Sequence, residues 1–511
     1  MIARAVLNSS QTGRLTATPR PPSITRVSAS PNRKTATIGI LVGLLLSALD
    51  GTVVATALPK ILDELDGFTL YFLPNALFML CQTVSMPLWG RLSDFYGRRR
   101  FHLAAVLILV AGSVLCGMSH TMGALVGFRA LQGLGAGGLM SLSFTMIADL
   151  YDLEERAKMQ GAISSVWGIA ALIGPLLGGW MTKQFGWPSI FFLNIPVGFV
   201  TAVMVQISWQ DRPSAGKGRI DLPGAVLLAL ASGALLAGFQ FAGREGWTTP
   251  HSLESFGAAL ALVVALVLVE RATAQPFLAF DLYKNRLFTT GAATGVCAMI
   301  CLFAAIMHVP LLVTGVLQQS LEKGGLMLTC MMLPWMVCSA LTKPLLKKFS
   351  YRTLAIGGML LAGAAYAMLW HVGMDASVAP VIAAMVVLGT GLGLTVAPLL
   401  IAAQNAVTKD RLGTATSLTQ FTRSMGSAVG LAIMGTLFLA PFNGKEPEGL
   451  IDLKTKFDPS KLKVVVAPLV VGLHHVFLAT ILFAGLGILL ALSIPAGKAA
   501  DLKAPSPAPE G

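Results

Sequence analysis

Two charged residues lie inside long apolar runs of this chain, where charge is costly. Asp50 interrupts the run 38–58, and Arg129 lies within the run 122–148. An ionisable side chain at membrane depth is destabilising unless it is paired, hydrated or neutralised, so it marks function by default. A carboxylate there can carry a proton or bind a cationic ligand. A fixed structural ion pair with Arg129 is the alternative.

Asp50 and Arg129 are expected to lie at the same depth in a membrane. Each is about two helical turns from the outer end of its run, so both lie roughly 10–12 Å below the outer boundary. Burial favours the protonated form of a carboxylate, whereas a neighbouring guanidinium favours the ionised form. A site under both influences can change its protonation as water access changes, which is what a proton antiporter requires.

The segment GRLSDFYGRRRF places one acidic residue, Asp94, among several arginines. Gly90 and Gly97 allow close packing and a sharp turn on either side of it. The spacing predicts a charge network of Asp94 with Arg98 and Arg99 at the inner face of the membrane. The alternative is a solvated loop acid, because exposed charge pairs contribute little.

The rest of the chain supplies helices that position these groups. Hydrophobic residues make up 55% of the 511 residues and charged residues 12%, with 53 glycines. This composition is too hydrophobic and too poor in charge for a soluble domain, and it is typical of a multi-span membrane protein. A run such as 38–58 forms a helix about 31 Å long, which matches the roughly 30 Å hydrocarbon core of a bilayer.

Fourteen apolar segments are predicted to cross the bilayer, and the distribution of Lys and Arg places both termini inside the cell. Most of the 37 Lys and Arg residues then lie in the tail and the inner loops. The net charge of +13 therefore reports membrane topology, and no nucleic-acid partner needs to be invoked. The predicted spans are 38–58, 69–89, 102–119, 122–148, 161–182, 189–209, 222–242, 255–270, 289–313, 324–346, 353–370, 378–404, 414–440 and 470–495.

Two sets of glycines with the same spacing indicate an internal repeat. The first set is Gly161, Gly174 and Gly178, and the second is Gly413, Gly426 and Gly430. Paired halves in a membrane protein favour a transporter whose site lies between the halves. The predicted organisation is a disordered cytoplasmic tail (1–36), a six-helix half (37–209), two inserted helices with linkers (210–288), a second six-helix half (289–495, with an extracytoplasmic loop 441–469) and a cytoplasmic tail (496–511).

The Gly-x-Leu-x-Asp-x-x-Gly-Arg-Arg-Arg spacing around Asp94 closely resembles the loop signature of the major facilitator superfamily. This resemblance implies a gating role at the inner membrane face for the loop residues Gly90, Asp94, Gly97, Arg98 and Arg99. The stretch from Arg129 to Gln132 and beyond resembles the fourth-helix motif of that family, in which the buried Arg is implicated in proton coupling. The opening stretch, with Asp50, Thr52, Leu58 and Pro59, resembles the first-helix motif of the fourteen-helix drug–proton antiporters. Ala55 stands where that branch often has Asn.

A fourth segment is similar to the antiporter motif of the fifth helix in the same family. It contains Gly174, Pro175, Gly178 and Gly179, although Ala170 stands where the family has another Gly. These residues are expected to shape helix packing rather than to touch substrate. The second half carries only a degenerate copy of the loop signature, KPLLKKFSYR, which predicts an asymmetric inner gate.

The resemblance implies an all-α integral membrane protein of the major facilitator fold, with two six-helix halves, two inserted helices and fourteen transmembrane helices. It implies proton-coupled multidrug efflux of hydrophobic or cationic compounds by alternating access. A specific exporter of one metabolite or antibiotic and a non-transporting membrane sensor are the alternatives. The location is the plasma membrane, or the inner membrane in a Gram-negative source.

An enzyme is not expected, because no P-loop, nucleophile elbow or metal-ligand spacing is visible. No cofactor or metal is expected, and the partners are small-molecule substrates, protons and the lipid bilayer. The oligomeric state stays open, a monomer included. The roles of the inserted pair 222–270 and of the 441–469 loop are also open.

Three further residues are candidates for a cavity lining: Gln132, His308 and Arg423. His308 lies near the outer end of its span and either titrates near neutral pH or is a hydrogen-bonded structural histidine. Arg423 lies in the span 414–440 and either lines an inner vestibule or extends to the interface.

Overall fold

The computed structural model describes residues 32–65, 73–151, 153–211, 221–273, 278–319, 321–374, 376–408, 411–442 and 459–497, and within these ranges it is helical with no strand. The elements are α1 (Arg33–Leu65), α2 (Leu73–Tyr96), α3 (Arg98–Gly117), α4 (Met122–Leu150), α5 (Leu153–Phe185), α6 (Pro188–Phe192), α7 (Asn194–Ser208), α8 (Leu222–Glu245), α9 (Pro250–Ala272), η2 (Phe280–Lys284), α10 (Arg286–Leu311), η3 (Leu312–Val316), α11 (Leu321–Ala340), α12 (Thr342–Lys348), α13 (Tyr351–Trp370), α14 (Ala379–Asn405), α15 (Leu412–Leu439), η5 (Ala440–Phe442) and α16 (Pro459–Leu492).

Nine helices of the described residues are long and apolar enough to cross a membrane, and a tenth span results if the bent pair Lys323–Ala340 and Thr342–Lys348 counts as one. The fourteen-span count and the inward termini therefore stay predictions. The structure also breaks the predicted span 189–209 into α6 and α7, whose junction lies at Leu193.

Two helices begin inside segments predicted to be a tail and a loop, and one predicted span is bent. α1 begins at Arg33, inside the predicted tail, although residues 1–31 lie outside the described part of the chain. α16 begins at Pro459, inside the predicted loop 441–469, because the Val-rich stretch that follows continues the helix and Pro suits its first turn. The span 324–346 bends by 55° where α11 meets α12.

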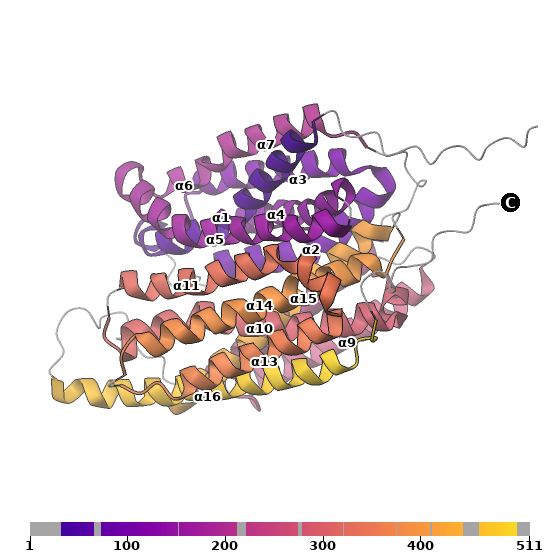
Figure 1. Ribbon diagram of the computed structural model, residues 1–511. Coiled ribbons are helices and arrows are strands. Elements are labelled where there is room, and N and C mark those ends of the chain that lie inside the picture. The colour runs from indigo at the N-terminus through magenta and orange to yellow at the C-terminus, as the bar shows by residue number, and fades with distance from the viewer. Residues whose placement is uncertain are drawn as a thin grey trace, which may run out of the picture.

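The helices form two bundles and one additional pair (Figure 1). Helices α1 to α7 pack mainly on one another, and α10 to α16 do the same; these are called here the first and the second bundle. The pair α8–α9 lies against α2 of the first bundle and α15 of the second. The bundles meet along two seams, α2 with α15 and α5 with α11.

Glycines bring the helices of each bundle close together in a repeated way. In the first bundle, a Cβ on Gly135 of α4 would lie 2.7 Å from the Ala105 carbonyl oxygen of α3. In the second bundle, a Cβ on Gly393 of α14 would lie 2.9 Å from the Trp335 carbonyl oxygen of α11. Such distances exclude any side chain, so α4 and α14 pack backbone to backbone with their neighbours.

Candidate functional site

The first candidate site is a buried ion pair in the first bundle. The Arg129 Nη1 of α4 donates to the Asp50 carboxylate of α1, and the two side chains are 0% and 1% exposed. The Arg129 guanidinium also stacks 4.0 Å from the centre of the Phe78 ring. The predicted equal depth of Asp50 and Arg129 thus corresponds to direct contact in the structure.

Amide side chains complete the shell around the Asp50 carboxylate. Gln132 Nε2 donates to Asp50 Oδ1 at 2.6 Å, and Asn194 Nδ2 of α7 donates to the same oxygen at 3.1 Å. The Ser113 hydroxyl of α3 accepts from Gln132 Nε2 at 2.5 Å and from Asn194 Nδ2 at 2.7 Å. Four helices therefore contribute to one polar cluster, which holds the carboxylate between a cation and neutral donors.

Sequence reasoning did not select Asn194 or Ser113 for this cluster. The signal for Asn194 was present, because it is a lone amide in the apolar stretch IFFLNIPVGF. Ser113 gave no signal, since serine is common in membrane helices. Asn75 of α2 also reaches the cluster, and its Oδ1 accepts from Arg129 Nη2 at 3.3 Å.

The second candidate site joins the two bundles at the end of α2. Asp94 Oδ1 accepts from Arg98 Nη1 at 2.5 Å and from the Gly413 amide at 3.1 Å. Asp94 Oδ2 accepts from the Thr414 amide at 2.7 Å and from its hydroxyl at 2.8 Å. Because α15 begins at Leu412, the carboxylate caps the positive end of that helix.

Arg98 and Gly97 fix the turn that presents Asp94. Arg98 is largely buried, and its Nε donates to Asp149 Oδ2 of α4 at 2.8 Å. Gly97 has a φ of +102°, a conformation that L side chains rarely adopt. The Arg99 backbone amide, rather than its side chain, donates to Asp211 Oδ1 at 2.9 Å.

Close packing surrounds this junction. A Cβ on Gly90 would lie 2.7 Å from the Gly413 carbonyl oxygen and would overlap the Ser417 side chain. Gly90 therefore lets α2 touch α15 directly. The seam α5–α11 is equally close, since a Cβ on Gly161 would lie 2.7 Å from the Ala340 Cβ.

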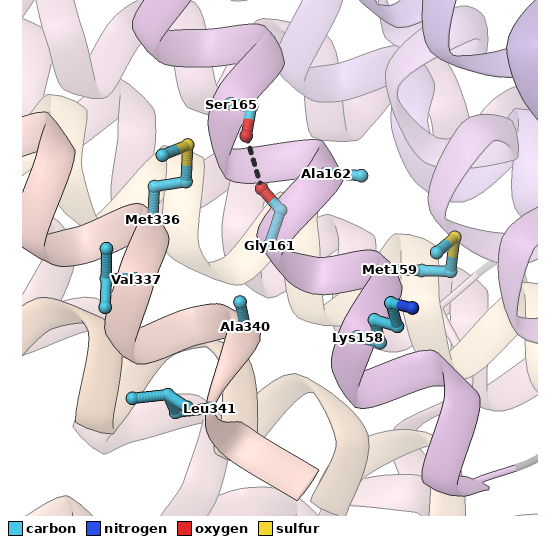
Figure 2. A pocket seen from close by; sticks show the side chains of 9 residues that line it. All are labelled: Lys158, Met159, Gly161, Ala162, Ser165, Met336, Val337, Ala340 and Leu341. Atoms are coloured by element: carbon cyan, nitrogen blue, oxygen red, sulfur yellow. Dashed lines mark hydrogen bonds between the residues drawn. The ribbon is translucent and has the colours of Figure 1, made fainter.

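A mostly apolar groove of about 440 Å³ follows the α5–α11 seam (Figure 2). It is lined by Lys158, Met159, Gly161, Ala162, Ser165, Met336, Val337, Ala340 and Leu341. The Ser165 hydroxyl donates to the Gly161 carbonyl at 2.8 Å, within α5 itself. No candidate residue from the motifs around Asp50 or Asp94 lines this groove.

The antiporter-motif residues lie in the C-terminal half of α5, past the residues that line the groove. α5 runs from Leu153 to Phe185 without a break at Pro175. Gly174 and Gly178 are buried, whereas Gly179 is exposed and a Cβ there would meet no atom within 4 Å.

The remaining candidates lie in the second bundle. His308 of α10 is 6% exposed, with Nδ1 3.0 Å from the Ala304 carbonyl oxygen and its ring 5.7 Å from that of Phe438. Arg423 of α15 is 4% exposed, and its Nη2 donates to the Val396 carbonyl at 3.2 Å. The structure thus separates both residues from Asp50, and places Arg423 inside the bundle.

The exposed ion pair of Asp281 and Arg411 lies outside the predicted spans and joins η2 to the residue before α15. Arg411 donates to both oxygens of Asp281, at 2.5 and 3.0 Å. The hydrogen bonds from Arg411 hold the pKa of the Asp281 carboxyl below its ordinary value. Among the described residues, no group of three His, Cys, Asp or Glu side chains could hold a metal ion.

Comparisons with known proteins agree with this architecture. The chain is 30% identical over 506 residues to the multidrug transporter protein MdtP of Bacillus subtilis (strain 168), covering 91% of this chain and 94% of that protein. It is 30% identical over 431 residues to multidrug resistance protein 3 of the same strain, covering 84% of each. The fold matches that of the human organic anion transporter MFSD10, with a TM-score of 0.63 at 16% identity over 90% of this chain and 100% of that one.

The profile of the Major Facilitator Superfamily matches residues 40–431, which is most of the chain. Together with the apolar helices, this match makes the protein a multi-span membrane transporter rather than an enzyme. The chain belongs to the Major Facilitator Superfamily.

Proposed function

We propose that this transporter exports hydrophobic or cationic compounds in exchange for protons by alternating access. The names of its relatives support multidrug efflux. The observation that carries the proton part is the Asp50 carboxylate, which is buried and paired with Arg129. Among ionisable groups, a carboxylate at membrane depth is suited to carry one proton per cycle.

Protonation of Asp50 is the proposed coupling step. The proton neutralises the carboxylate and leaves the Arg129 guanidinium buried without a counter-charge, which is costly. The cluster then favours a different arrangement of α1 and α4, in which Arg129 finds another acceptor or water. Loss of the proton to the other side restores the ion pair, and substrate moves between the two states.

Asp94 is the proposed gate residue. In the predicted topology, with fourteen spans and both termini inside, Asp94 and the α15 N-terminus lie at the cytoplasmic face. The contact between them then corresponds to a state closed toward the cytoplasm. With the proposed halves at 37–209 and 289–495, this contact holds the two halves together on the cytoplasmic side. The proposed role of Gly174, Pro175, Gly178 and Gly179 is to let α5 move against its neighbours.

The test is dye efflux from proteoliposomes under an imposed pH gradient. Wild type and Asp50→Asn are compared at matched insertion, with rhodamine B ethyl ester as the cationic probe. The proposal expects gradient-driven efflux in wild type and its loss in the variant. Gradient-driven efflux that survives in Asp50→Asn would move the proton site elsewhere, and no efflux of cationic dyes from wild type would favour a specific exporter.

A further inference from the structure

Arg129 and Arg423 are both buried inside predicted spans, but they differ in their partners. Arg129 is paired with Asp50, whereas Arg423 has no carboxylate within ion-pair distance among the described residues. Arg423 is bonded only to neutral acceptors, the Val396 carbonyl at 3.2 Å and Gln420 Oε1 at 3.5 Å. Its Nε, like that of Arg129, has no hydrogen-bond partner among the residues that the structure describes.

The helices around Arg423 offer it no counter-charge. The guanidinium lies between α10, α14 and α15, and none of these three helices contains an Asp or Glu. A buried cation without a compensating anion is strongly destabilising in a membrane protein. A neutral residue at this position would avoid that penalty, so the charge is explained if an anionic group arrives from outside the chain.

The surroundings are shaped to hold this guanidinium. On α10, Gly295 faces it so closely that a Cβ there would lie 2.6 Å from Arg423 Nε and 3.2 Å from Nη2. On α15, buried polar residues continue along the same helical face, one or two turns on either side of Arg423: Thr416, Thr419, Gln420 and Ser427. The result is a polar stripe with a single positive charge, and the missing side chain of Gly295 leaves room on the opposing helix for the guanidinium.

We propose that Arg423 is the binding residue for an anionic group, a carboxylate, on an amphiphilic substrate of this transporter. The proposal rests on the proposed export function and specifies, among its hydrophobic and cationic substrates, those that also carry a carboxylate. The planar guanidinium suits a carboxylate because its parallel N–H groups can bind both oxygens. The unpartnered Nε supplies one of these donors.

Two dyes with the same cationic ring system separate the acid from its ester. Rhodamine B carries a free carboxylate, and its ethyl ester does not. Fluorescence anisotropy with the purified full-length protein in detergent measures the affinity for each dye. Wild type is expected to bind the acid about tenfold or more tightly than the ester, since a desolvated charge pair contributes at least that much.

Four variants test whether Arg423 causes this preference. Arg423→Gln should abolish the preference for the acid and leave the ester affinity unchanged, while Arg423→Lys should retain part of it. Gly295→Ala should weaken acid binding because its Cβ displaces the guanidinium. The matched control is Gly291→Ala, one turn earlier on α10, where a Cβ would meet only Leu399 at 3.7 Å, and it should leave both affinities unchanged.

Thermal unfolding of wild type and Arg423→Gln tests whether Arg423 has a purely structural role. Arg423→Gln should be at least as stable as wild type, because it removes an uncompensated buried charge while Gln can still donate to Val396. Equal binding of the two dyes by wild type, no binding of the acid, or a preference that survives in Arg423→Gln would overturn the proposal.

The outcome is separable from that of the efflux assay. Transport of the ester under a proton gradient without any preference for the acid would leave the proposed function standing and remove this inference. If the preference for the acid depends on Arg423 but transport does not depend on the proton gradient, this inference stands and the proton coupling of the proposed function falls.

Discussion

Asp94 accepts hydrogen bonds from both the amide and the hydroxyl of Thr414, a residue 320 positions further along the chain. The carboxylate is 6% exposed and also binds Arg98. This contact is therefore a charged, mostly dehydrated cap on a helix of the other bundle. The hydrogen bonds from Thr414 to Asp94 therefore stabilise the contact between the two bundles rather than the fold of either bundle.

Asp94→Asn is expected to weaken the contact between α2 and α15. The amide keeps the shape but loses the charge, and hydrogen bonds to a charged group contribute about 1.5–3 kcal/mol. That range shifts the equilibrium between contact and separation about tenfold to a hundredfold. Single-molecule distance measurements between labels on α2 and α15 would report the shift. The matched control is Asp281→Asn, whose exposed pair with Arg411 does not cap α15, and an equal effect of both variants would contradict the capping role.

Asp50→Asn is expected to destabilise the protein through Arg129. Removing one partner of a buried ion pair leaves an uncompensated charge and costs about 3–5 kcal/mol. The double variant Asp50→Asn with Arg129→Gln should recover much of this loss, because both charges are gone. Thermal or denaturant unfolding of the single and double variants measures the coupling. Additive losses would show that the two side chains do not act as a pair.

Gly90→Ala is expected to force α2 away from α15. The added Cβ would overlap Ser417 and lie 2.7 Å from the Gly413 carbonyl oxygen, which cannot move without shifting the helix. Maleimide labelling of a cysteine placed at Ser417 should become faster as the seam opens. Gly127→Ala on α4 is the control, because a Cβ there would meet nothing within 4 Å. Labelling that is unchanged by Gly90→Ala would mean that the seam tolerates the methyl group.

The Asp281–Arg411 pair predicts a small pH effect on stability with a definite sign. The pKa of Asp281 is lowered from 3.8 by the hydrogen bonds from Arg411, so the unfolded chain binds this proton more readily. The stabilisation is fully present above pH 3.8 and is lost as the pH falls through the lowered folded value. Because the carboxylate is half exposed, the contribution should stay below about 1 kcal/mol. Thermal midpoints of wild type and Asp281→Asn should differ slightly at neutral pH and converge in acid.

Local patterns predicted the parts of the two sites that lie close in sequence or depth. The spacing of Asp50 and Arg129 along their runs placed them at one level, and the structure brings them into contact. The four-residue spacing of Asp94 and Arg98 likewise gives an ion pair on adjacent helix ends. The first relationship follows from helix rise, and the second from a short turn at Gly97 between two helices.

Partners from distant segments could not be obtained in this way. Thr414 and Asn194 reach Asp94 and Asp50 only after several helices have packed, and no spacing rule connects them. The position of Arg423 is similar, since a guanidinium in the middle of a span can extend to either boundary or stay inside. Gly295 on α10 leaves room for the guanidinium, which therefore stays inside the bundle. Breaks at Leu193 and Leu341 also escaped the hydropathy pattern, because both neighbouring segments are apolar.

The pair α8–α9 has a consequence for compounds dissolved in the lipid. It packs on both α2 and α15, and its Leu228 and Leu266 join a buried cluster with Val84 and Leu418 from those helices. An amphiphile in the bilayer can enter a transporter sideways only where two bundles part. The pair α8–α9 covers the α2–α15 seam, whereas the α5–α11 seam, which carries the apolar groove, is the one that this pair leaves open to the lipid (Figure 2).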